Sequence, residues 1–389
     1  MKRRPPLQAQ DLPGLTRLLT DATLGLTDVV EAMHARVASL PLLPARPGGR
    51  TGGLTGQVYR AVRGVTSGVG QGLDLLLRQL PSAAPAQPQP AREAWLAALN
   101  GVLGDHLLQS ANPLAIPMRL RLGGQALDLQ RAELATRVQG EGLLLLVHGL
   151  CMNDLQWQQA GQDHGAQLAA ALGLQPLYLH YNTGLPIAAN GRTLAALLTV
   201  LHAAWPQPLR RIVLLGHSMG GLVLRSALHQ APGAAWAQAV SHLLCLGSPH
   251  LGAPLERAGR GVDLLLGAAP YAAPLARLGK VRSAGITDLR HGRLLDSSAV
   301  DRAPRAAVPL PTGMACHALA GTLGARAAAK TRLLGDGLVP LNSALGLHRN
   351  PALCLNFPAA HQHVFEGLGH IELLGSAAVG QRLVEIAAR

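Results

Sequence analysis

The sequence has few aromatic residues, few lysines and no long uninterrupted apolar run. Aromatic residues make up 3% of the 389 positions while 48% are hydrophobic, so a buried core must consist mainly of Leu, Ala and Val. No stretch of 18 or more apolar residues without a charge occurs, so no helix is predicted to span a membrane. The chain is long enough for one large domain or two smaller ones.

Cysteine is also scarce and follows no pattern. Cys151, Cys245, Cys316 and Cys354 show no C-x-x-C spacing and no spacing to histidines that would indicate a zinc site. The basic start is followed by Pro5-Pro6-Leu7-Gln8 rather than an apolar segment, so no secretory signal peptide is predicted. We expect a cytoplasmic protein without disulfides and without a bound cofactor.

Acidic residues are few: 21 Asp and Glu stand against 34 Lys and Arg, and the net charge is +13. The arginines are scattered, and the densest basic cluster is Lys2-Arg3-Arg4. Nucleic-acid binders concentrate their charge on one face or in runs, so no nucleic acid is expected as a partner. Two interpretations stay open: a genomic bias toward Arg and Ala, or peripheral attraction to an anionic membrane surface.

Residues 1–110 are predicted to form an N-terminal helical extension with Pro- and Gly-rich linkers. Apolar residues recur at helical spacing over 14–40 and again over 58–80, and a third helix is predicted over 91–109. The first two helices could form a hairpin that packs on the main domain. The packed hairpin is the favoured interpretation, and an arm that binds a surface or a partner is the alternative.

Residues 111–389 are predicted to form an α/β domain with a mostly parallel central sheet and helices on both faces. After a β-hairpin at 118–129, short apolar runs alternate with helical stretches, as in parallel sheets covered on both faces. Residues 251–312 lack a clear strand and indicate a lid or cap insertion, although a simple packing surface is equally compatible. The predicted strands cover 143–147, 175–181, 211–215, 242–246, 316–320 and 352–355, and the predicted helices lie near 158–172, 190–204 and 219–230.

The strongest chemical signal is the segment Gly216-His217-Ser218-Met219-Gly220, between an apolar strand and a predicted helix. In a strand–G-x-S-x-G–helix pattern, the serine occupies a tight, strained turn that displays its Oγ at the helix N-terminus. Gly216 and Gly220 lack the side chains that would clash there. A Gly-rich turn with an incidental serine would need neither a strand before it nor a helix after it. We therefore predict Ser218 to be a nucleophile.

A serine nucleophile needs a general base, and the base needs an acid that orients it. In this strand–turn–helix arrangement the acid follows the serine along the chain, and the histidine follows the acid. Asp336 lies between two glycines after a predicted strand and is the predicted acid. Its rivals Asp288, Asp296 and Asp301 lie in the insertion instead.

The predicted base is His370, in a Gly-flanked loop just before the last helix. Position and flanking residues favour it over the other histidines that follow Asp336 or precede it closely. These rivals are His361, His363, His317 and His348. His361-Gln362-His363 also has a spacing that could bind a metal, but nothing supplies the remaining ligands, so no metal is predicted.

A separate segment, His148-Gly149-Leu150, follows the apolar strand at 143–147. A loop in this place supplies one hydrogen-bond donor to an oxyanion, and the residue after the nucleophile supplies the other. The backbone N–H groups of Leu150 and Met219 are the predicted donors. Each is worth on the order of 3 kcal/mol in the transition state.

Together these segments resemble the lipase branch of the α/β-hydrolase superfamily, including the GPI inositol-deacylase-like serine esterases. The resemblance covers about residues 140–389 and implies the α/β-hydrolase fold, a carboxylic-ester hydrolase with an acyl-Ser218 intermediate, and lipid-like substrates. Many lipases of this branch bind structural calcium, but no matching carboxylate pair is found here and none is predicted. The matching segments are 148–150, Tyr181-Asn182-Thr183-Gly184, 216–221, 247–254, 335–340 and 369–371.

Other activities remain compatible with the same three residues. An acyltransferase would pass the acyl group to an alcohol, and an amide or thioester hydrolase would use the same nucleophile. A non-catalytic scaffold would need none of Ser218, Asp336 and His370, so their joint presence argues against it.

Overall fold

The structure is a computed structural model that describes residues 7–38, 50–78, 89–253, 283–296, 308–324 and 334–389. Its contacts divide the chain into two compact units. One unit, called the body here, comprises Pro88–His106 and Ile116–Arg389. The other, called the hairpin unit, comprises Pro6–Gln87 and Leu107–Ala115. This division differs from the predicted boundary at residue 110, because most of the third helix belongs to the body.

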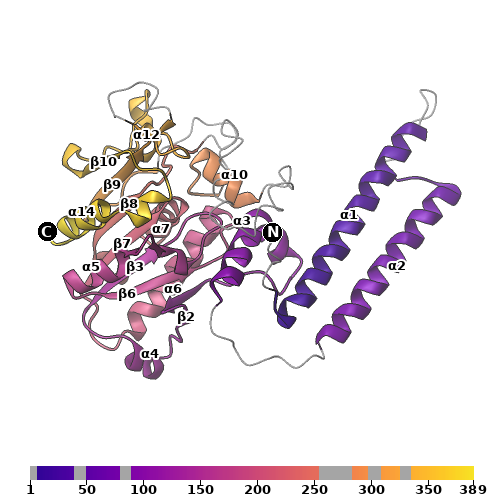
Figure 1. Ribbon diagram of the computed structural model, residues 1–389, viewed down its shortest axis with the longest axis horizontal. Helices are drawn as coiled ribbons and strands as arrows, with labels where there is room; N and C mark the ends of the chain where they lie inside the picture. The colour runs from indigo at the N-terminus through magenta and orange to yellow at the C-terminus, as the bar shows by residue number, and fades with distance from the viewer. Residues whose placement is uncertain (1–6, 39–49, 79–88, 254–282, 297–307, 325–333) are drawn as a thin grey trace. The chain divides into compact units, whose positions relative to one another are not determined.

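The body is built on a sheet of eight described strands in the order β10-β9-β8-β7-β3-β6-β1-β2 (Figure 1). Neighbours from β10 to β6 are parallel, whereas β1 is antiparallel to both β6 and β2. This arrangement confirms the predicted α/β fold with a mostly parallel sheet. The strands are β1 (Arg119–Leu122), β2 (Gln125–Ala126), β3 (Gly142–Val147), β6 (Gln175–His180), β7 (Arg211–His217), β8 (Val240–Leu246), β9 (Ala315–Thr322) and β10 (Gln362–Glu366).

Helices cover both faces of the sheet, as the sequence predicts. Residues of α5, α13 and α14 form one apolar core with the sheet, and residues of α3, α4, α6 and α7 contribute to the other. The helical segments of the body are α3 (Pro90–Gln109), α4 (Arg131–Arg137), η2 (Asp154–Trp157), α5 (His164–Leu172), α6 (Ile187–Ala204), α7 (Met219–Gln230), α8 (Ala235–Gln238), α10 (Ala284–His291), α12 (Leu341–Ala344), η4 (Pro351–Leu353), η5 (Ala359–His361), α13 (Glu372–Gly375) and α14 (Ala377–Ala387).

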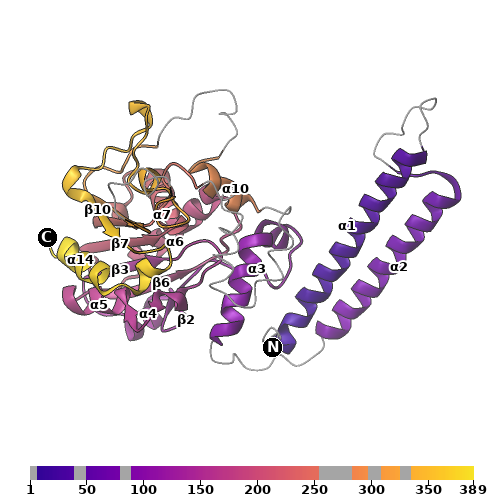
Figure 2. The same cartoon turned by 45° about the horizontal axis from the view of Figure 1, so that its top comes forward.

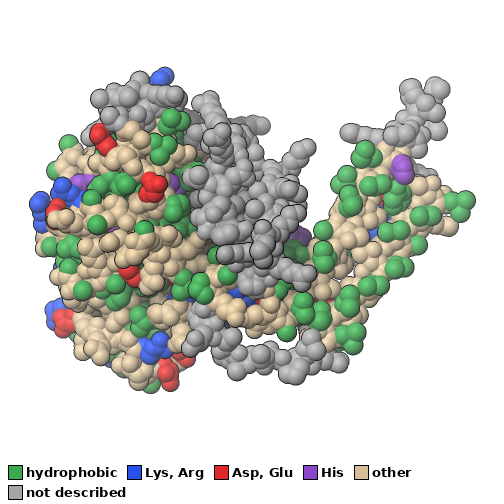
Figure 3. All heavy atoms as spheres, in the orientation of Figure 1, with side chains coloured by type: hydrophobic (Ala, Val, Ile, Leu, Met, Phe, Trp, Pro, Cys, Tyr) green, Lys and Arg blue, Asp and Glu red, His purple; other side chains and the backbone are tan. Residues whose placement is uncertain are grey.

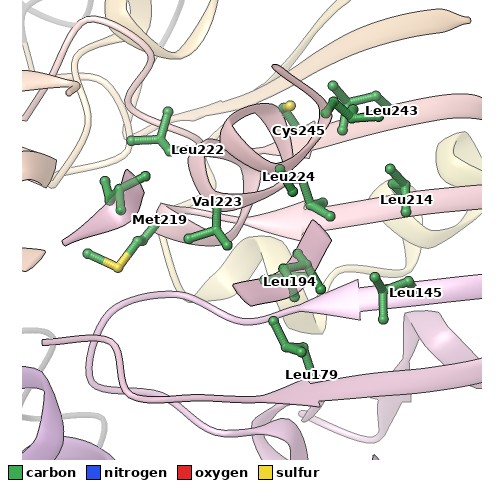
Figure 4. Packing of buried hydrophobic residues seen from close by; sticks show 14 of the residues in the cluster. Leu145, Leu179, Leu194, Leu214, Met219, Leu222, Val223, Leu224, Leu243 and Cys245 are labelled. Carbon is green, nitrogen blue, oxygen red and sulfur yellow. The ribbon is translucent and has the colours of Figure 1, made fainter. Parts of the chain in front are cut away.

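The central strand β3 shows why its apolar run forms a strand. Leu143, Leu145 and Val147 join the core on the side of α6 and α7, and Leu144 and Leu146 join the core on the side of α5 and α14. Figure 4 shows the first core, with Leu145 of β3 near Leu194 of α6 and Leu214 of β7. Each buried leucine contributes roughly 1.5–3 kcal/mol. Because both faces of β3 are buried, its side chains are apolar on both faces and do not alternate between apolar and polar.

The order of the strands reverses at the centre of the sheet. The chain passes from β3 to β6 on one side of β3 and then crosses to β7 on the other side. Such a reversal of strand order leaves an opening at the carboxyl ends of the strands, where α/β proteins place their functional sites. The loop at 148–153 and the turn at Ser218 follow β3 and β7 directly.

Two predicted elements are wrong, and the first has a local cause. Residues 352–355 form no strand, because the Asn350 side chain accepts the Ala352 N–H (3.1 Å) and caps the 3-10 turn η4. The last strand is instead β10, whose mixed Gln-His-Val-Phe-Glu sequence lacks an apolar run. Residues 158–163, predicted to be helical, form the short pair β4 (Gln158–Gln159) and β5 (Gln162–Asp163).

The predicted insertion at 251–312 lies mostly outside the described residues, so its proposed role as a lid does too. Within it, α10 begins after Ser283, whose Oγ accepts the Ile286 N–H (3.3 Å). The helix is also bound to the start of α6, where Asp288 Oδ2 accepts the N–H of Ile187 (3.0 Å).

The hairpin unit contains two antiparallel helices, α1 (Leu12–Ala38) and α2 (Gly53–Arg78), with the short turn η1 (Ala9–Asp11) before them (Figure 2). Arg17 bonds to both oxygens of Asp74 (3.0 and 2.7 Å), and Arg63 bonds to Asp28 (2.8 Å) and Glu31. Most apolar side chains at helical spacing are exposed instead (Figure 3). They include Leu19, Leu26, Val29 and Met33 on α1 and Val58, Val65, Val69, Leu75 and Leu76 on α2.

One described helix, α6, is long and apolar enough to cross a membrane by length and composition. Its position in the body accounts for that composition. Ile187, Leu194, Leu198 and Leu201 are buried in the core between α6, α7 and the sheet. A packed core helix satisfies the same test as a membrane span, so α6 is weak evidence for one.

Candidate active site

Ser218 joins β7 to α7 in a backbone conformation that side chains rarely adopt. Its φ is 53° and its ψ is −122°. For a residue with a Cβ this conformation is strained and persists only where surrounding structure imposes it. Here the Ser218 N–H donates to the carbonyl of Leu246 (2.8 Å), and the Ser218 carbonyl accepts the N–H of Gly221 (3.2 Å). The turn therefore has the strain that the sequence pattern predicts.

The glycines on either side of Ser218 allow the backbones to meet. A Cβ on Gly216 would lie 2.4 Å from the nitrogen of Gly221, and one on Gly220 would lie 2.0 Å from the carbonyl oxygen of Val147. Both distances are too short for any side chain. A larger residue at either position would push α7 away from β3 and β7, and with it Ser218.

Asp336 and His370 lie side by side after β9 and β10. The Nδ1–H of His370 donates to Asp336 Oδ2 (2.7 Å), and both side chains are almost fully buried. The other carboxylate oxygen accepts the N–H groups of Leu338 (3.0 Å) and Val339 (2.8 Å). These three bonds fix the carboxylate and the tautomer of the histidine, because a donating Nδ1–H leaves Nε2 as the acceptor nitrogen.

The ring of His370 lies next to the end of β8, the strand that binds the Ser218 backbone. A Cβ on Gly247 would stand 3.3 Å from the His370 ring. Gly247 follows Leu246, whose carbonyl accepts the Ser218 N–H. His217, the neighbour of Ser218, packs its ring 4.7 Å from that of His370 and donates Nε2–H to the His370 carbonyl (3.1 Å). The buried Nε2 of His370 has no partner among the described residues.

The loop after β3 lies against Ser218 from the other side. A Cβ on Gly149 would stand 2.9 Å from the Ser218 Cβ, so no larger residue fits between the loop and the serine. Leu150 is buried in this loop. Met219 is the first residue of α7, and its N–H is one of those that a helix leaves without an intrahelical acceptor. The structure thus brings the segments of Ser218, Asp336, His370, Leu150 and Met219 to one edge of the sheet.

The rival acids and one rival base occupy other places. Asp288 is engaged with the Ile187 N–H, and burial raises the pKa of its carboxyl. Asp296 belongs to an exposed ion pair with Arg192. Asp301 lies outside the described residues, and His348 is exposed.

The remaining rival histidines form a cluster at the opposite end of the strands. The ring of His317 stacks on that of His361 (centroids 3.9 Å apart), and its Nδ1 lies 3.2 Å from the Nε2 of His363. With His242 they line a cavity of about 620 Å³ at the amino ends of β8, β9 and β10. Among the described side chains, no three His, Cys, Asp or Glu residues are arranged to hold a metal ion.

Burial keeps two imidazoles near Ser218 uncharged. Desolvation lowers the pKa of His148 to about 3, although its hydrogen bond to the Gly149 carbonyl acts in the opposite direction. Desolvation also lowers the pKa of His217, and the neighbouring His370 adds to this effect. Neither residue can serve as a cation at neutral pH, so both act only as neutral hydrogen-bonding groups.

We expect the free energy of unfolding to fall as the pH is lowered from about 6.5 toward 3. In this range the imidazole of His148 takes up a proton in the unfolded chain, where its pKa has the ordinary value of 6.5, but not in the folded chain, where burial lowers the pKa to about 3. One such group makes stability fall by about 1.4 kcal/mol per pH unit. Urea titrations at several pH values should show a shallower dependence for His148→Asn than for the parent. Parallel dependences would contradict the buried neutral state.

Comparison with known proteins agrees with this architecture. Residues 138–299 match the family described as PGAP1-like alpha/beta domain, a segment that contains Leu150, Ser218 and Met219. No curated protein matches the chain. The sheet order shows the mostly parallel α/β fold that the resemblance implies, and residues 138–299 are similar to this family.

Solved structures that match part of the chain include several lipases. The mature form of the Bacillus licheniformis lipase BlEst2 is 20% identical, with 63% of this chain and 90% of that chain covered and a TM-score of 0.42. A lipase-esterase related protein from Clostridium acetobutylicum is 14% identical, with 64% and 94% covered and a TM-score of 0.36. Staphylococcus hyicus lipase is 11% identical, with 65% and 95% covered and a TM-score of 0.36.

Proposed function

We propose that the chain is a serine hydrolase that cleaves carboxylic esters, with lipid-like esters as its substrates. One observation carries the proposal: the strained turn at Ser218 lies at the same edge of the sheet as the 2.7 Å hydrogen bond between His370 Nδ1 and Asp336 Oδ2. A nucleophile on a strained turn and a base held in one tautomer are the two parts that acyl transfer requires.

In this proposal Ser218 Oγ attacks the ester carbonyl carbon while His370 Nε2 removes its proton. The carbonyl oxygen becomes an oxyanion that accepts hydrogen bonds from the Leu150 and Met219 N–H groups. Collapse of this intermediate breaks the bond to the alcohol, which leaves with the proton from His370, and an acyl-Ser218 ester remains. Water, deprotonated by His370, then attacks the acyl group and releases the acid and the free serine.

The test combines turnover with covalent labelling. We expect the purified chain to hydrolyse p-nitrophenyl esters from acetate to palmitate. A fluorophosphonate should abolish that activity with one phosphonyl group per chain, and mass spectrometry should place the group on Ser218 within tryptic peptide 212–225. A label on another residue, or full activity of completely labelled protein, would overturn the proposal.

The same assays separate the alternatives that share the fold. Faster acyl transfer to an added alcohol than to water would indicate an acyltransferase. Cleavage of anilides or thioesters in place of esters would indicate the corresponding hydrolase. A chain that neither turns over nor reacts with the fluorophosphonate would be a non-catalytic scaffold.

We also propose that the hairpin unit binds an anionic membrane surface from the cytoplasmic side, where a lipid-like ester would be found. Support comes from the apolar side chains that α1 and α2 leave exposed, among them Leu26, Met33, Val65 and Leu76. The net charge of +13 favours an anionic over a neutral surface. Apolar residues on one side of a helix insert into the headgroup region of a bilayer.

Substitution of Leu26, Met33, Val65 and Leu76 by glutamine is expected to weaken binding to phosphatidylglycerol-containing vesicles by at least about 100-fold, because each buried side chain contributes roughly 1.5–3 kcal/mol. Vesicle flotation measures the bound fraction. Val200→Gln, at an exposed apolar position on α6 in the body, is the matched control and should bind like the parent. Equal flotation of the fourfold variant and the parent would rule out this role of the hairpin unit.

A further inference from the structure

The segment Tyr181-Asn182-Thr183-Gly184 follows β6 and has no part in the proposed chemistry, yet its side chains reach the loop after β3. The Tyr181 hydroxyl donates to the carbonyl oxygen of His148 (2.8 Å), and the Thr183 Oγ1 accepts the N–H of Cys151 (3.1 Å). Tyr181, Thr183 and Cys151 are all buried. Two residues of one segment therefore bind the loop on either side of Leu150.

The peptide that carries the Leu150 N–H lies between these two bonds. Its own carbonyl, that of Gly149, accepts hydrogen bonds from His148 Nδ1 (3.0 Å) and from the N–H of Met152 (3.3 Å). A trans peptide is planar, so the direction of its carbonyl fixes the opposite direction of its N–H. Three successive peptides, from His148 to Cys151, are thus each held by at least one hydrogen bond.

The loop needs such support because its backbone is strained. Cys151 has a φ of 58°, a left-handed conformation that is unfavourable for a residue with a Cβ. If Cys151 relaxed to an ordinary conformation, the Leu150–Cys151 peptide would rotate. The Leu150 N–H belongs to the neighbouring peptide and would be displaced with it. The bond from Cys151 N–H to Thr183 opposes this relaxation directly.

Helix α3 holds the segment from the other side. The Asn182 side chain donates to the Gly104 carbonyl (2.9 Å) and accepts the Gly184 N–H (3.0 Å). On the same helix, a Cβ at Gly101 would stand 2.2 Å from the Sγ of Cys151, so the helix packs directly on the strained residue. Helix α3 therefore supports both the loop and the segment that binds it.

We propose that Tyr181 and Thr183 are positioning residues that hold the Leu150 N–H in the direction needed to bind the oxyanion. This inference rests on the proposed function, because it gives the segment a role in the same acyl transfer. Neither residue touches the reacting atoms, so their effect must act on the transition state through the loop and leave binding of the ester ground state unchanged.

Thr183→Val removes the acceptor for the Cys151 N–H and nearly keeps the volume of the side chain. We expect kcat for p-nitrophenyl butyrate to fall about 10- to 100-fold, less than the 100- to 1,000-fold for loss of an oxyanion donor, with KM nearly unchanged. Affinity for a trifluoromethyl ketone, which forms an oxyanion on Ser218, should fall in parallel with kcat/KM. Thr183→Ser keeps the hydroxyl and should restore most of both.

The control is Thr199→Val on α6, which removes a hydroxyl bonded to the Ala195 carbonyl (2.9 Å) and should leave kcat unchanged. Tyr181→Phe should lower kcat only about tenfold, because it frees the His148 carbonyl while the Gly149–Leu150 peptide keeps its own bonds. If Thr183→Val lowers thermal stability but changes neither kcat nor ketone affinity, the residue is only structural and the proposal is wrong, while the proposed function stands. Absence of turnover and labelling in the parent would overturn both.

Discussion

Replacement of Ser218 by alanine is expected to reduce kcat for ester hydrolysis by on the order of a million-fold, to the residual rate that binding and the oxyanion donors alone support. Without Oγ no acyl-enzyme can form, and His370 has no proton to remove from a nucleophile. The strained turn would remain, because its hydrogen bonds to Leu246 and Gly221 come from the backbone. Steady-state kinetics with p-nitrophenyl butyrate, together with a fluorophosphonate labelling assay, measure the effect.

A second buried serine on the same helix provides the control for this substitution. Ser226 lies two turns further along α7 and donates its hydroxyl to the Leu294 carbonyl (2.7 Å). Ser226→Ala should lower stability by about 1 kcal/mol and leave kcat within a few-fold of the parent. Ester hydrolysis by Ser218→Ala at a rate close to that of Ser226→Ala would exclude Ser218 as the nucleophile.

The central sheet was predictable because its strands are buried on both faces. A run such as Leu143-Leu144-Leu145-Leu146-Val147 can satisfy two apolar cores only as a strand between two helical layers, so its pattern indicates both the element and its surroundings. At the edge of the sheet this signal fails. Strand β10 carries His363 and Glu366, and only pairing with β9 identifies it.

The segments of the candidate site were also predictable, because each follows a strand of the sheet and carries glycines that allow a tight turn. The residues around them were not. His217, Tyr181 and Thr183 act through hydrogen bonds between positions 32 to 153 residues apart in the chain. No local pattern contains such a pairing. Only the resemblance of Tyr181-Asn182-Thr183-Gly184 to a known loop marks that segment, and it gives no role to the individual side chains.

The hairpin unit illustrates a different limit. Periodic apolar residues on α1 and α2 predict amphipathic helices correctly, but the period does not say what covers the apolar side. In the structure the two helices meet through ion pairs such as Arg17–Asp74 and leave Leu26 and Val65 exposed. A helix packed on a core and a helix bound to a membrane surface have the same apolar periodicity, so the sequence pattern does not distinguish them.

Asp336→Asn is expected to lower kcat by about 10⁴-fold and to change stability little, because an amide is nearly the same size as the carboxylate. The amide oxygen can still accept the N–H groups of Leu338 and Val339, which points the NH₂ group toward His370. That group donates where the carboxylate accepted, so His370 Nδ1 must become the acceptor and Nε2 must carry the proton. An imidazole in this tautomer cannot remove the proton from Ser218. Kinetics of the variant measure the loss, and Asp288→Asn, which alters the half-buried acid on α10, should stay within a few-fold of the parent. Reversed results for the two variants would move the orienting role from Asp336 to Asp288.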